Sequence, residues 1–432
     1  MSNQQVNIGI IGLGTVGTGV ARVLLQQREL LKTRTQVMFN LKAISELDWD
    51  KERDIDLSTV KCTTDAQELI DDSVIDVIVE TIGGYEPAFT FVSRALQNGK
   101  HVVTANKALI ATRGSELFKI AQENDVKLLF EASVGGGIPI IKGLREGLIA
   151  NKIERMYGIL NGTSNYILTK MHKDDLEFSE ALKGAQESGF AEADPTLDIS
   201  GGDAAHKLTI LSSIASNSFV SYENLYIEGI TGISKVDINF AKSLGYTIKL
   251  LAVYRTFNGG LDLRVHPTLV ENNHLLAAVS NEMNAILVRG DFVGNTMFYG
   301  PGAGERPTAS AIVSDIVDLS HDLLLKNEKY KTQSINTTMD ANLIPIEEIT
   351  NRFYLRFFTK DIPGVLTKIS GVLAEHGISI SSMVQLETHE KDNYVPIVLL
   401  THEALEKSMK RALEKIVKFE FVKEDYLRLR IF

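Results

Sequence analysis

Cysteine is almost absent from the sequence, and long apolar runs are absent as well. The only cysteine among 432 residues is Cys62, which excludes an internal disulfide framework and any zinc site built from cysteines, and fits a reducing compartment. No stretch of about 18 residues stays free of glycines and charges, and the first residues, MSNQQVN, include no basic side chain. We therefore expect neither export nor membrane insertion, and interpret the protein as cytoplasmic.

Positive charge is also scarce. The sequence has 45 Lys and Arg against 55 Asp and Glu, which gives a formal net charge of −10 at pH 7. Without a run rich in lysine or arginine, nucleic acid and anionic membranes are poor candidates for the main partner. A small metabolite fits the composition better, and the length favours two or three domains, each with its own apolar core.

From Val6 to about Leu129, short β-branched runs alternate with longer amphipathic stretches. In order they are VNIGIIG, GTGVARVLLQQ, VMFNLKAIS, VIDVIVETI, KHVVTA and VKLLFEA. This rhythm is typical of βαβ units and predicts an α/β domain of the Rossmann type, with a parallel, doubly wound sheet.

Glycine-rich turns mark the middle of the chain, from about 130 to 340, namely SVGGGIP, NGTSN, ISGGD and GPGAG. They alternate with strands such as RMYGIL and helical runs such as AAHKLTILSSIA. A new pattern begins near DANLIPIEEITN, and residues 352–432 have the order strand, helix, strand, strand, helix, strand. That order predicts a ferredoxin-like domain, whose first helix is opened by DIPG, residues 361–364.

GLGTVG places Gly12, Gly14 and Gly17 at the G-x-G-x-x-G spacing between an apolar strand and a helix. In this motif the first glycine allows the turn, the second lets the backbone approach a pyrophosphate, and the phosphates bind at the helix N-terminus. The alternative is a glycine-lined turn that only packs the helix on the strand. Glu46 follows the second strand, where an acid binds the adenosine ribose in NAD enzymes, so it favours NAD.

Two lysines are candidates for chemistry. Lys107 ends a predicted strand in VVTANKALIA, at the sheet edge where ligands bind, although a lone lysine there is usually a solvated charge. Lys207 shares one helical face with Asp203 and His206, at the spacing i, i+3, i+4. For this second lysine the alternative is a surface ion pair, worth about a few tenths of a kcal/mol.

Four carboxylates precede Lys207 within FAEADPTLDISGGDAAHKL: Glu192, Asp194, Asp198 and Asp203. The flanking run ILSSIA predicts that this cluster is partly buried, and unpaired charges there would be too costly unless a ligand completes them. An α-amino acid is such a ligand, because its ammonium group requires carboxylates.

EASVGGGIPI, residues 131–140, resembles a cation-binding loop in outline. Glu131 supplies a carboxylate and the glycines expose carbonyl oxygens, the hard ligands that sodium or a similar ion takes. Because no second acid is obvious, the charge favours a monovalent ion. The alternative is a tight turn between domains.

Together these motifs resemble homoserine dehydrogenases of the bacterial form with a C-terminal ACT domain. The resemblance runs in order through GIIGLGTVG, VIVETIGG, VVTANKALIA, FEASVGGGIPII, GILNGTSNYIL, GFAEADPTLDISGGDAAHKL, YGPGAGERPTASAIVSDI, RFYLRFFTKDIPGVLTKIS and ISISSMVQ. It implies an NAD(P)-binding Rossmann domain at 1–130, to which residues of about 300–335 return. It also implies an α+β catalytic and dimerisation domain at 131–340 and an ACT regulatory domain at 352–432.

The resemblance also assigns roles to residues. Lys107 and Lys207 match the catalytic pair, with Lys207 as proton donor, and the substrate-binding acids are Glu192, Asp198 and Asp203. The cofactor residues are Gly12, Leu13, Gly14, Thr15, Val16, Gly17, Glu46, Thr81, Ile82, Lys107 and Gly302. The sodium position comprises Glu131 and the carbonyls of Val134, Gly136 and Ile138. One departure is Ser45 followed by Glu46, where many NADP-preferring relatives carry an arginine followed by an acid, which puts NADP preference in doubt.

The implied reaction is the interconversion of L-homoserine and L-aspartate 4-semialdehyde with NADP or NAD, on the route to threonine, methionine and isoleucine. An amino-acid effector is expected to bind the ACT domain, with threonine as the main candidate. The protein is expected to form a homodimer or homotetramer. One rival is a 2-hydroxy-acid dehydrogenase, which needs a histidine with an acid at the hydride acceptor; His206 fits this role poorly. The other is a non-catalytic amino-acid sensor, which would be expected to lack the two lysines.

Overall fold

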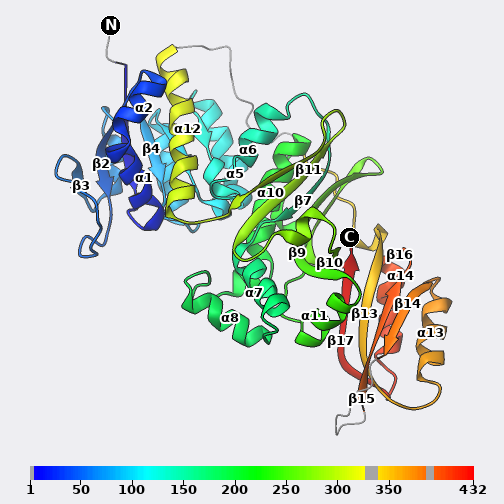
Figure 1. The fold of residues 1–432 in the computed structure, drawn as a ribbon. Coiled ribbons are helices and arrows are strands. Elements are labelled where there is room, and N and C mark those ends of the chain that lie inside the picture. The colour runs from blue at the N-terminus through cyan, green and yellow to red at the C-terminus, as the bar shows by residue number, and fades with distance from the viewer. Residues whose placement is uncertain (1–3, 326–338, 386–393) are drawn as a thin grey trace. The chain divides into compact units, whose positions relative to one another are not determined.

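The computed structural model describes residues 4–325, 339–385 and 394–432, which form two compact units (Figure 1). The first comprises Met1–Ile153, His206–Asn224 and Asn284–Ala341, and the second Glu154–Ala205, Leu225–Met283 and Asn342–Phe432. Within the described ranges, no helix is long and apolar enough to cross a membrane. The predicted return of residues of about 300–335 and the predicted ACT domain at 352–432 each extend in part outside the described residues.

A parallel six-stranded sheet forms the centre of the first unit, with the order β3-β2-β1-β4-β5-β6. Its strands are β1 (Gln5–Ile11), β2 (Met38–Ser45), β3 (Lys61–Thr63), β4 (Val77–Glu80), β5 (His101–Thr104) and β6 (Leu128–Leu129). The inner strands are apolar on both faces because helices cover both sides of such a sheet. The predicted doubly wound, Rossmann-type sheet is confirmed.

Helices of the first unit come from both ends of its sequence. They are α1 (Thr15–Gln26), α2 (Arg28–Thr35), α3 (Ala66–Asp71), α4 (Ala88–Gln97), α5 (Lys107–Glu123), α6 (Ile140–Lys142) and α12 (Glu305–Leu325). Val20 of α1 and Ile312 of α12 are fully buried in one apolar core. Gly19 allows this close packing, because a Cβ there would lie 2.7 Å from Glu305. The helix α12 thus completes the core of the nucleotide-binding part.

The second unit is built on a mixed sheet with the strand order β7-β9-β10-β17-β13-β15-β14. Its strands are β7 (Ile153–Ile159), β8 (Tyr226–Ile227), β9 (Tyr246–Phe257), β10 (Gly260–Glu271), β13 (Thr350–Lys360), β14 (Ile380–Gln385), β15 (Tyr394–Thr401), β16 (Ala404–Leu405) and β17 (Val422–Ile431). Its helices are α7 (Gly162–Lys173), α8 (Phe178–Glu187), α9 (Thr196–Ile199), α11 (Lys235–Ser243), α13 (Val365–Glu375) and α14 (Glu406–Ile416). The helix α10 (Gly202–Ser216) passes from this unit into the first, where the strands β11 (Met283–Gly290) and β12 (Gly294–Pro301) precede α12.

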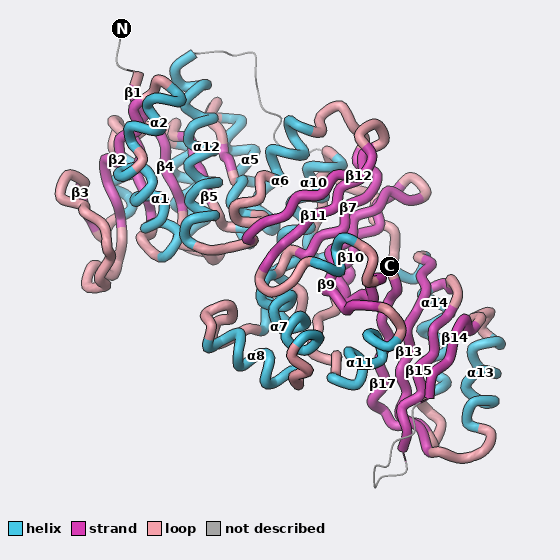
Figure 2. The backbone as a smooth tube through the Cα atoms, viewed as in Figure 1, coloured by secondary structure: helices cyan, strands magenta, loops and turns pink. Residues whose placement is uncertain are grey.

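The last 80 or so residues have the ferredoxin-like arrangement that the sequence predicts. Figure 2 shows β17, β13, β15 and β14 side by side, with α13 and α14 beside them. The apolar faces of β13, α13 and α14 form a separate core, which includes Phe353, Leu373 and Leu413. The predicted ACT fold is confirmed.

This ACT domain is joined to the catalytic part of the second unit by backbone and by charge. The strand β17 pairs in parallel with β10, at Thr268 with Arg430 and Leu269 with Ile431. The side chain of Arg356, only 1% exposed, donates to the buried carboxylate of Asp237 at 2.9 Å. Truncation before residue 352 would therefore strip β10 of a strand and leave Asp237 without its cation.

Candidate active site

The glycine-rich loop after β1 has the geometry that a dinucleotide requires. Gly12 has a φ of 97°, in the left-handed region that favours glycine. Gly14 is the N-cap of α1, and a Cβ there would meet nothing within 4 Å, which leaves the backbone open to a phosphate. A Cβ at Gly17 would lie 2.0 Å from the carbonyl oxygen of Gly12, so only glycine lets the helix pack so closely on the turn. The loop therefore fits a pyrophosphate at the start of α1.

Glu46, which follows β2, contacts this loop directly. Its carboxylate accepts the N–H of Leu13 at 2.5 Å and those of Leu47 and Asp48 at 2.8 and 3.0 Å. Arg53 lies beside it, with 3.6 Å between Nη2 and Oε2, and donates to the carbonyl of Leu13. Partial burial acts to raise the pKa of Glu46, but these N–H donors and Arg53 outweigh it and hold the pKa below its ordinary value. Arg53 is a charged residue of this site that the sequence did not single out.

Thr81 and Ile82 follow β4 and lie against the same loop. The Thr81 hydroxyl donates to the carbonyl of Gly12 at 2.8 Å, and its N–H donates to that of Ile11 at 2.9 Å. A Cβ on Gly12 would meet the side chain of Ile82 at 2.7 Å. The structure thus brings two predicted cofactor residues together with the glycine motif.

A buried carboxylate that sequence reasoning missed, Glu80, holds this turn in place. One of its oxygens accepts the N–H groups of Ile82 and Gly83 at 2.8 and 3.0 Å, and the other accepts the hydroxyl of Thr104. Glu80 therefore ties the end of β4 to the end of β5. The signal for it was an acid as the last residue of an apolar strand, in VIVETIGG.

Lys107 is the first residue of α5, directly after β5. The N-cap is Asn106, whose side-chain oxygen accepts the N–H of Leu109 at 3.1 Å and whose nitrogen donates to the carbonyl of Gly84 at 2.7 Å. A cation at a helix N-terminus opposes the helix dipole, at a cost of about 0.3–1 kcal/mol. This unfavourable placement of a half-buried lysine favours a functional role over a solvated charge.

Lys207 lies near the start of α10 and is 8% exposed. The helices α10 and α5 are in contact, because Thr209 and Ile210 of α10 line one small cavity with Ile110 and Ala111 of α5. Each lysine precedes this contact by about one turn in its own helix. The first unit thus brings together the helices of the two predicted catalytic lysines.

Aromatic side chains connect the surroundings of the two lysines. The ring of His206, next to Lys207, lies 4.3 Å from the ring of Tyr222, centroid to centroid. Burial raises the pKa of the Tyr222 hydroxyl, and the neighbouring Tyr85 hydroxyl adds to the rise. Tyr85 in turn follows the turn that Asn106 binds.

In the second unit, Asn161 brings two of the predicted substrate acids together. Its side-chain nitrogen donates to Asp198 Oδ1 at 2.7 Å and to Asp203 Oδ2 at 2.8 Å. Its side-chain oxygen caps α7 by accepting the N–H of Ser164 at 2.7 Å, and the Ser164 hydroxyl donates to the Asp198 carbonyl. The motif NGTSN therefore positions the acidic segment. The arrangement places two carboxylates side by side, which suits an ammonium group.

The other two acids of the segment differ from the prediction. Asp203 is 4% exposed, but Glu192 and Asp194 are exposed, so the predicted burial is wrong for them. They lie on the loop between α8 and α9, where Asp194 accepts the N–H and hydroxyl of Thr196 at 3.1 and 2.6 Å. Polar side chains on such a surface loop need no buried partner.

The predicted cation loop begins at Glu131, whose carboxylate turns to the start of α6. Its two oxygens accept the N–H groups of Ile141 and Lys142 at 3.0 and 2.8 Å. Gly136 has a φ of 56°, and a Cβ there would lie 2.6 Å from the carbonyl carbon of Gly302. The cation loop and the turn of Gly302 therefore pack directly on each other.

A second buried acid, Asp315 of α12, adjoins this loop. It accepts the N–H of Glu131 at 2.9 Å and lies 3.7 Å from the Lys142 ammonium. Burial raises the pKa of Asp315 to about 7 and that of Glu131 to about 6, and Lys142 compensates only in part.

Family models match three successive stretches of the chain. The model of the homoserine dehydrogenase NAD binding domain matches residues 12–131, that of homoserine dehydrogenase matches 139–317, and that of the ACT domain matches 353–418. The chain is 43% identical to the homoserine dehydrogenase of Pseudomonas aeruginosa, over 99% of each chain. It is 40% identical to that of Bacillus subtilis, over 98% of this chain and 97% of the other.

Solved structures give the same picture. A homoserine dehydrogenase from Thiobacillus denitrificans matches with a TM-score of 0.94 and 44% identity, over 99% of this chain and 98% of the other. A hyperthermophilic archaeal homoserine dehydrogenase in complex with NADPH matches with a TM-score of 0.63 and 29% identity, over 75% of this chain and 98% of the other. The likeness therefore includes the nucleotide-binding, catalytic and ACT parts.

The substitution Asp315→Asn should flatten the dependence of stability on pH. The folded-state pKa of about 7 lies above the ordinary value of 3.8, so between these values the folded protein binds more protons than the unfolded chain. The stability contributed by Asp315 is therefore present at low pH and lost as the pH rises through about 7. Urea midpoints should fall less between about pH 5 and pH 8 in the variant than in the wild type.

The matched control is Asp318→Asn, on the same helix and also paired with Lys142, but 46% exposed. Because Asp318 is the smallest of the causes that act on the pKa of Asp315, the profile of this variant should stay closer to that of the wild type than the profile of Asp315→Asn does. Parallel profiles for Asp315→Asn and the wild type would contradict the raised pKa of Asp315.

Proposed function

The chain belongs to the homoserine dehydrogenase family, and from this premise we propose which of its residues carry the reaction. As a member of the family, the protein is an NAD(P)-dependent oxidoreductase that interconverts L-homoserine and L-aspartate 4-semialdehyde. The nicotinamide cofactor supplies or accepts the hydride. The chain itself must orient the substrate and manage one proton and one negative charge.

Lys107 and Lys207 are the proposed catalytic pair. When a hydride reaches the aldehyde, its oxygen becomes an alkoxide, which an ammonium group stabilises and protonates. The observation that carries this proposal is the contact between α5 and α10, which places both lysines near the N-terminal ends of two packed helices. Lys207, the more buried of the two, is the proposed proton donor.

Asp198, Asp203 and Glu192 are proposed to bind the substrate ammonium. Support comes from Asn161, whose side-chain nitrogen donates to both Asp198 and Asp203 and so holds the two carboxylates side by side. Glu192 lies on the exposed loop of the same segment. Binding of the α-ammonium group by these acids would fix one end of the substrate and orient its C4 atom toward the two lysines.

We propose that NAD is the preferred cofactor and that NADP is also accepted. Glu46 carries its negative charge at the edge of the glycine-rich loop, where it can bind a ribose hydroxyl and repel a 2′-phosphate. Arg53 lies 3.6 Å from that carboxylate and offers the opposite charge to a phosphate. The remaining proposed cofactor residues are Leu13, Thr15, Val16, Thr81, Ile82 and Gly302.

A monovalent cation is proposed to bind the loop 131–138, and sodium is the main candidate. The Glu131 carboxylate already accepts two N–H groups at the start of α6. The proposed ligands are therefore main-chain carbonyl oxygens, those of Glu131, Val134, Gly136 and Ile138. A further polar group lies close by: Asn284 is fully buried against Gly302, and neither atom of its amide has a partner among the described residues. Oxygen ligands of this kind fit a hard cation.

The ACT domain is proposed to bind an amino-acid effector, with threonine as the main candidate, and to help form a homodimer or homotetramer. The strand β14 is the edge of the described ACT sheet, and an edge strand is a template for pairing with a second copy. We also propose a cytoplasmic location, which the single cysteine supports.

Replacing Lys207 by alanine should lower kcat by about a hundred-fold or more, because acid catalysis of this kind contributes roughly 10²–10⁴-fold. Steady-state rates in both directions measure the effect. Binding of NADH and NADPH, followed by fluorescence, should stay close to that of the wild type. A variant that retains more than about a tenth of wild-type kcat would place Lys207 outside the proton transfer.

The change Glu192→Gln should instead act on the substrate. It removes a charge partner of the ammonium, so the KM for homoserine should rise about tenfold while kcat changes less. Asp194→Asn, an exposed acid two residues later, is the matched control and should leave KM unchanged. Equal KM values for Glu192→Gln and the wild type would disconnect Glu192 from the ammonium.

Cofactor preference should follow the charge beside the glycine-rich loop. The wild type should have a lower KM for NADH than for NADPH. Glu46→Gln should lower the ratio of the KM for NADPH to the KM for NADH about tenfold, which corresponds to roughly 1.4 kcal/mol. Arg53→Gln should raise the KM for NADPH more than that for NADH. An unchanged ratio in both variants would remove these two residues from the ribose subsite.

Sodium should stabilise the protein beyond the effect of ionic strength. A cation that binds only the folded state at about a hundred times its Kd adds about 2.7 kcal/mol. Thermal unfolding in sodium chloride, compared with choline chloride at equal ionic strength, measures this. Coincident unfolding temperatures would contradict a sodium site.

A further inference from the structure

A lysine of the second unit is buried among neutral groups. Lys249, in β9, is 2% exposed, and its amine donates to the side-chain oxygen of Asn165 at 3.0 Å and to the carbonyl of Val279. Burial lowers the pKa of Lys249 to about 7, and the positive charge of Lys173 adds to the fall. Over the residues that it describes, the structure places no acid beside this lysine to offset the cost of burial.

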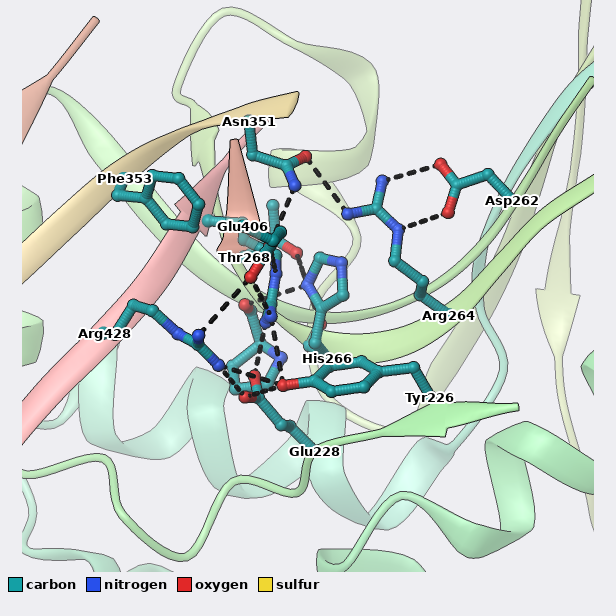
Figure 3. Close-up of polar contacts among 12 residues, drawn as sticks. Tyr226, Glu228, Asp262, Arg264, His266, Thr268, Asn351, Phe353, Glu406 and Arg428 are labelled. Carbon is teal, nitrogen blue, oxygen red and sulfur yellow. Dashed lines mark hydrogen bonds and ion pairs between the residues drawn. The ribbon is translucent and has the colours of Figure 1, made fainter. Parts of the chain in front are cut away.

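Two other buried cations of this unit do have acids beside them. Arg264 lies 2.7 Å from Asp262, a pair drawn in Figure 3, and Arg430 lies 2.5 Å from Glu406. A buried amine with neutral partners alone is costly in comparison with an apolar side chain of similar size. The presence of Lys249 therefore indicates a role other than stability.

Lys249 determines which way the side-chain amide of Asn165 faces. An ammonium group only donates hydrogen bonds, so the amide oxygen must face it. The amide nitrogen is thereby turned to the carbonyls of Val279, Asn281 and Met283, at 3.2, 2.9 and 3.2 Å. With the amide reversed, its oxygen would face three carbonyl oxygens, and these hydrogen bonds would be lost.

The amide ties α7 to the turn 279–283, and other positions of the helix contact the same turn. The Thr169 hydroxyl accepts the N–H of Asn281 at 3.0 Å, and a Cβ at Gly162 would lie 2.7 Å from the carbonyl oxygen of Glu282. Positions 162, 165 and 169 share one face of the helix, at the spacing i, i+3, i+7. The buried lysine joins this face to the turn, because it donates to both.

The first turn of α7 connects Asn165 to the proposed substrate acids. The N–H of Asn165 donates to the carbonyl of Asn161 at 3.2 Å. The side-chain nitrogen of Asn161 in turn holds Asp198 and Asp203. Because the interior is closely packed, a displacement at Asn165 must move Asn161 and the carboxylates that it holds. The contacts thus run from Lys249 through two asparagines to the acids.

We propose that Lys249 is a positioning residue for the substrate. Through the amide of Asn165 it fixes the first turn of α7, and with it the carboxylates that bind the ammonium group of homoserine. The proposal rests on the proposed function, since it takes Asp198 and Asp203 as the acids that bind this group. Loss of the lysine therefore weakens the binding of homoserine and leaves the hydride transfer step largely unchanged.

The first test, Lys249→Met, removes the amine and keeps an unbranched side chain of similar length. It should raise the KM for homoserine about tenfold, while kcat changes by less than about threefold. The matched control is Lys100→Met. Lys100 is 5% exposed and also donates to two carbonyls, those of Asp72 and Ile75 at 2.5 and 2.8 Å, but at the amino ends of the strands of the parallel sheet. Both variants should lower the unfolding temperature, and only Lys249→Met should raise the KM.

A second variant, Asn165→Asp, tests the route and stands in if Lys249→Met does not fold. It keeps an acceptor for Lys249 but replaces the donating nitrogen by an oxygen, so the bonds to the turn 279–283 are lost. The KM for homoserine should again rise about tenfold, although the lysine retains its partner. Asn124→Asp is the control, because the exposed Asn124 side chain also donates to a carbonyl, that of Ile120 at 2.8 Å. Its KM should equal that of the wild type.

Asp198→Asn, measured alongside on the full-length enzyme, separates the positioning role from the proposed function. If Asp198→Asn raises the KM for homoserine but Lys249→Met or Asn165→Asp leaves it within about twofold of the wild type, the positioning role is overturned. An equal rise in Lys100→Met, or a fall in kcat without a change in KM, would overturn it as well. An unchanged KM in Asp198→Asn would contradict the proposed function itself, and with it the premise of the positioning role.

Discussion

The side-chain amide of Asn161 is the interaction on which the substrate end of the molecule depends. It caps α7 with its oxygen and holds Asp198 and Asp203 with its nitrogen, so a neutral group fixes two negative ones. The nucleotide end uses the reverse arrangement, because the buried carboxylate of Glu80 is bound by neutral donors of the turn after β4. In both places hydrogen bonds from neutral groups fix the position of a carboxylate.

Much of the fold and part of the site could be predicted from the sequence. The parallel sheet follows from apolar runs that are buried on both faces, and the glycine motif follows from backbone geometry that only glycine permits. Glu80 and Arg53 were missed because an acid at a strand end and a base in a loop look like ordinary surface charges. The direction of the Glu131 carboxylate depends on α6, which is three residues long and leaves no periodic signal. The linear domain boundaries and the roles of single residues stay predictions, since each compact unit combines three stretches of chain.

Buried ion pairs gather where the ACT domain meets the catalytic part. Arg356 with Asp237, and Arg430 with Glu406, are nearly closed to solvent. Such pairs add little net stability compared with apolar side chains. Removing one partner leaves an uncompensated buried charge, which commonly lowers the free energy of unfolding by about 3–5 kcal/mol. Their consequence here is a fixed register between β17, β10 and α14, so that a change on the ACT side is transmitted as a displacement and is not absorbed by loose packing.

The strand β17 lies between β10 and β13 inside the sheet, although it comes after both of them in the chain. The sheet of the second unit is therefore completed only when a late segment inserts between two strands that are made earlier. Until that insertion, the facing edges of β10 and β13 are unpaired and can pair with other chains. During folding, the risk of aggregation for this unit is thus greatest before β17 is in place.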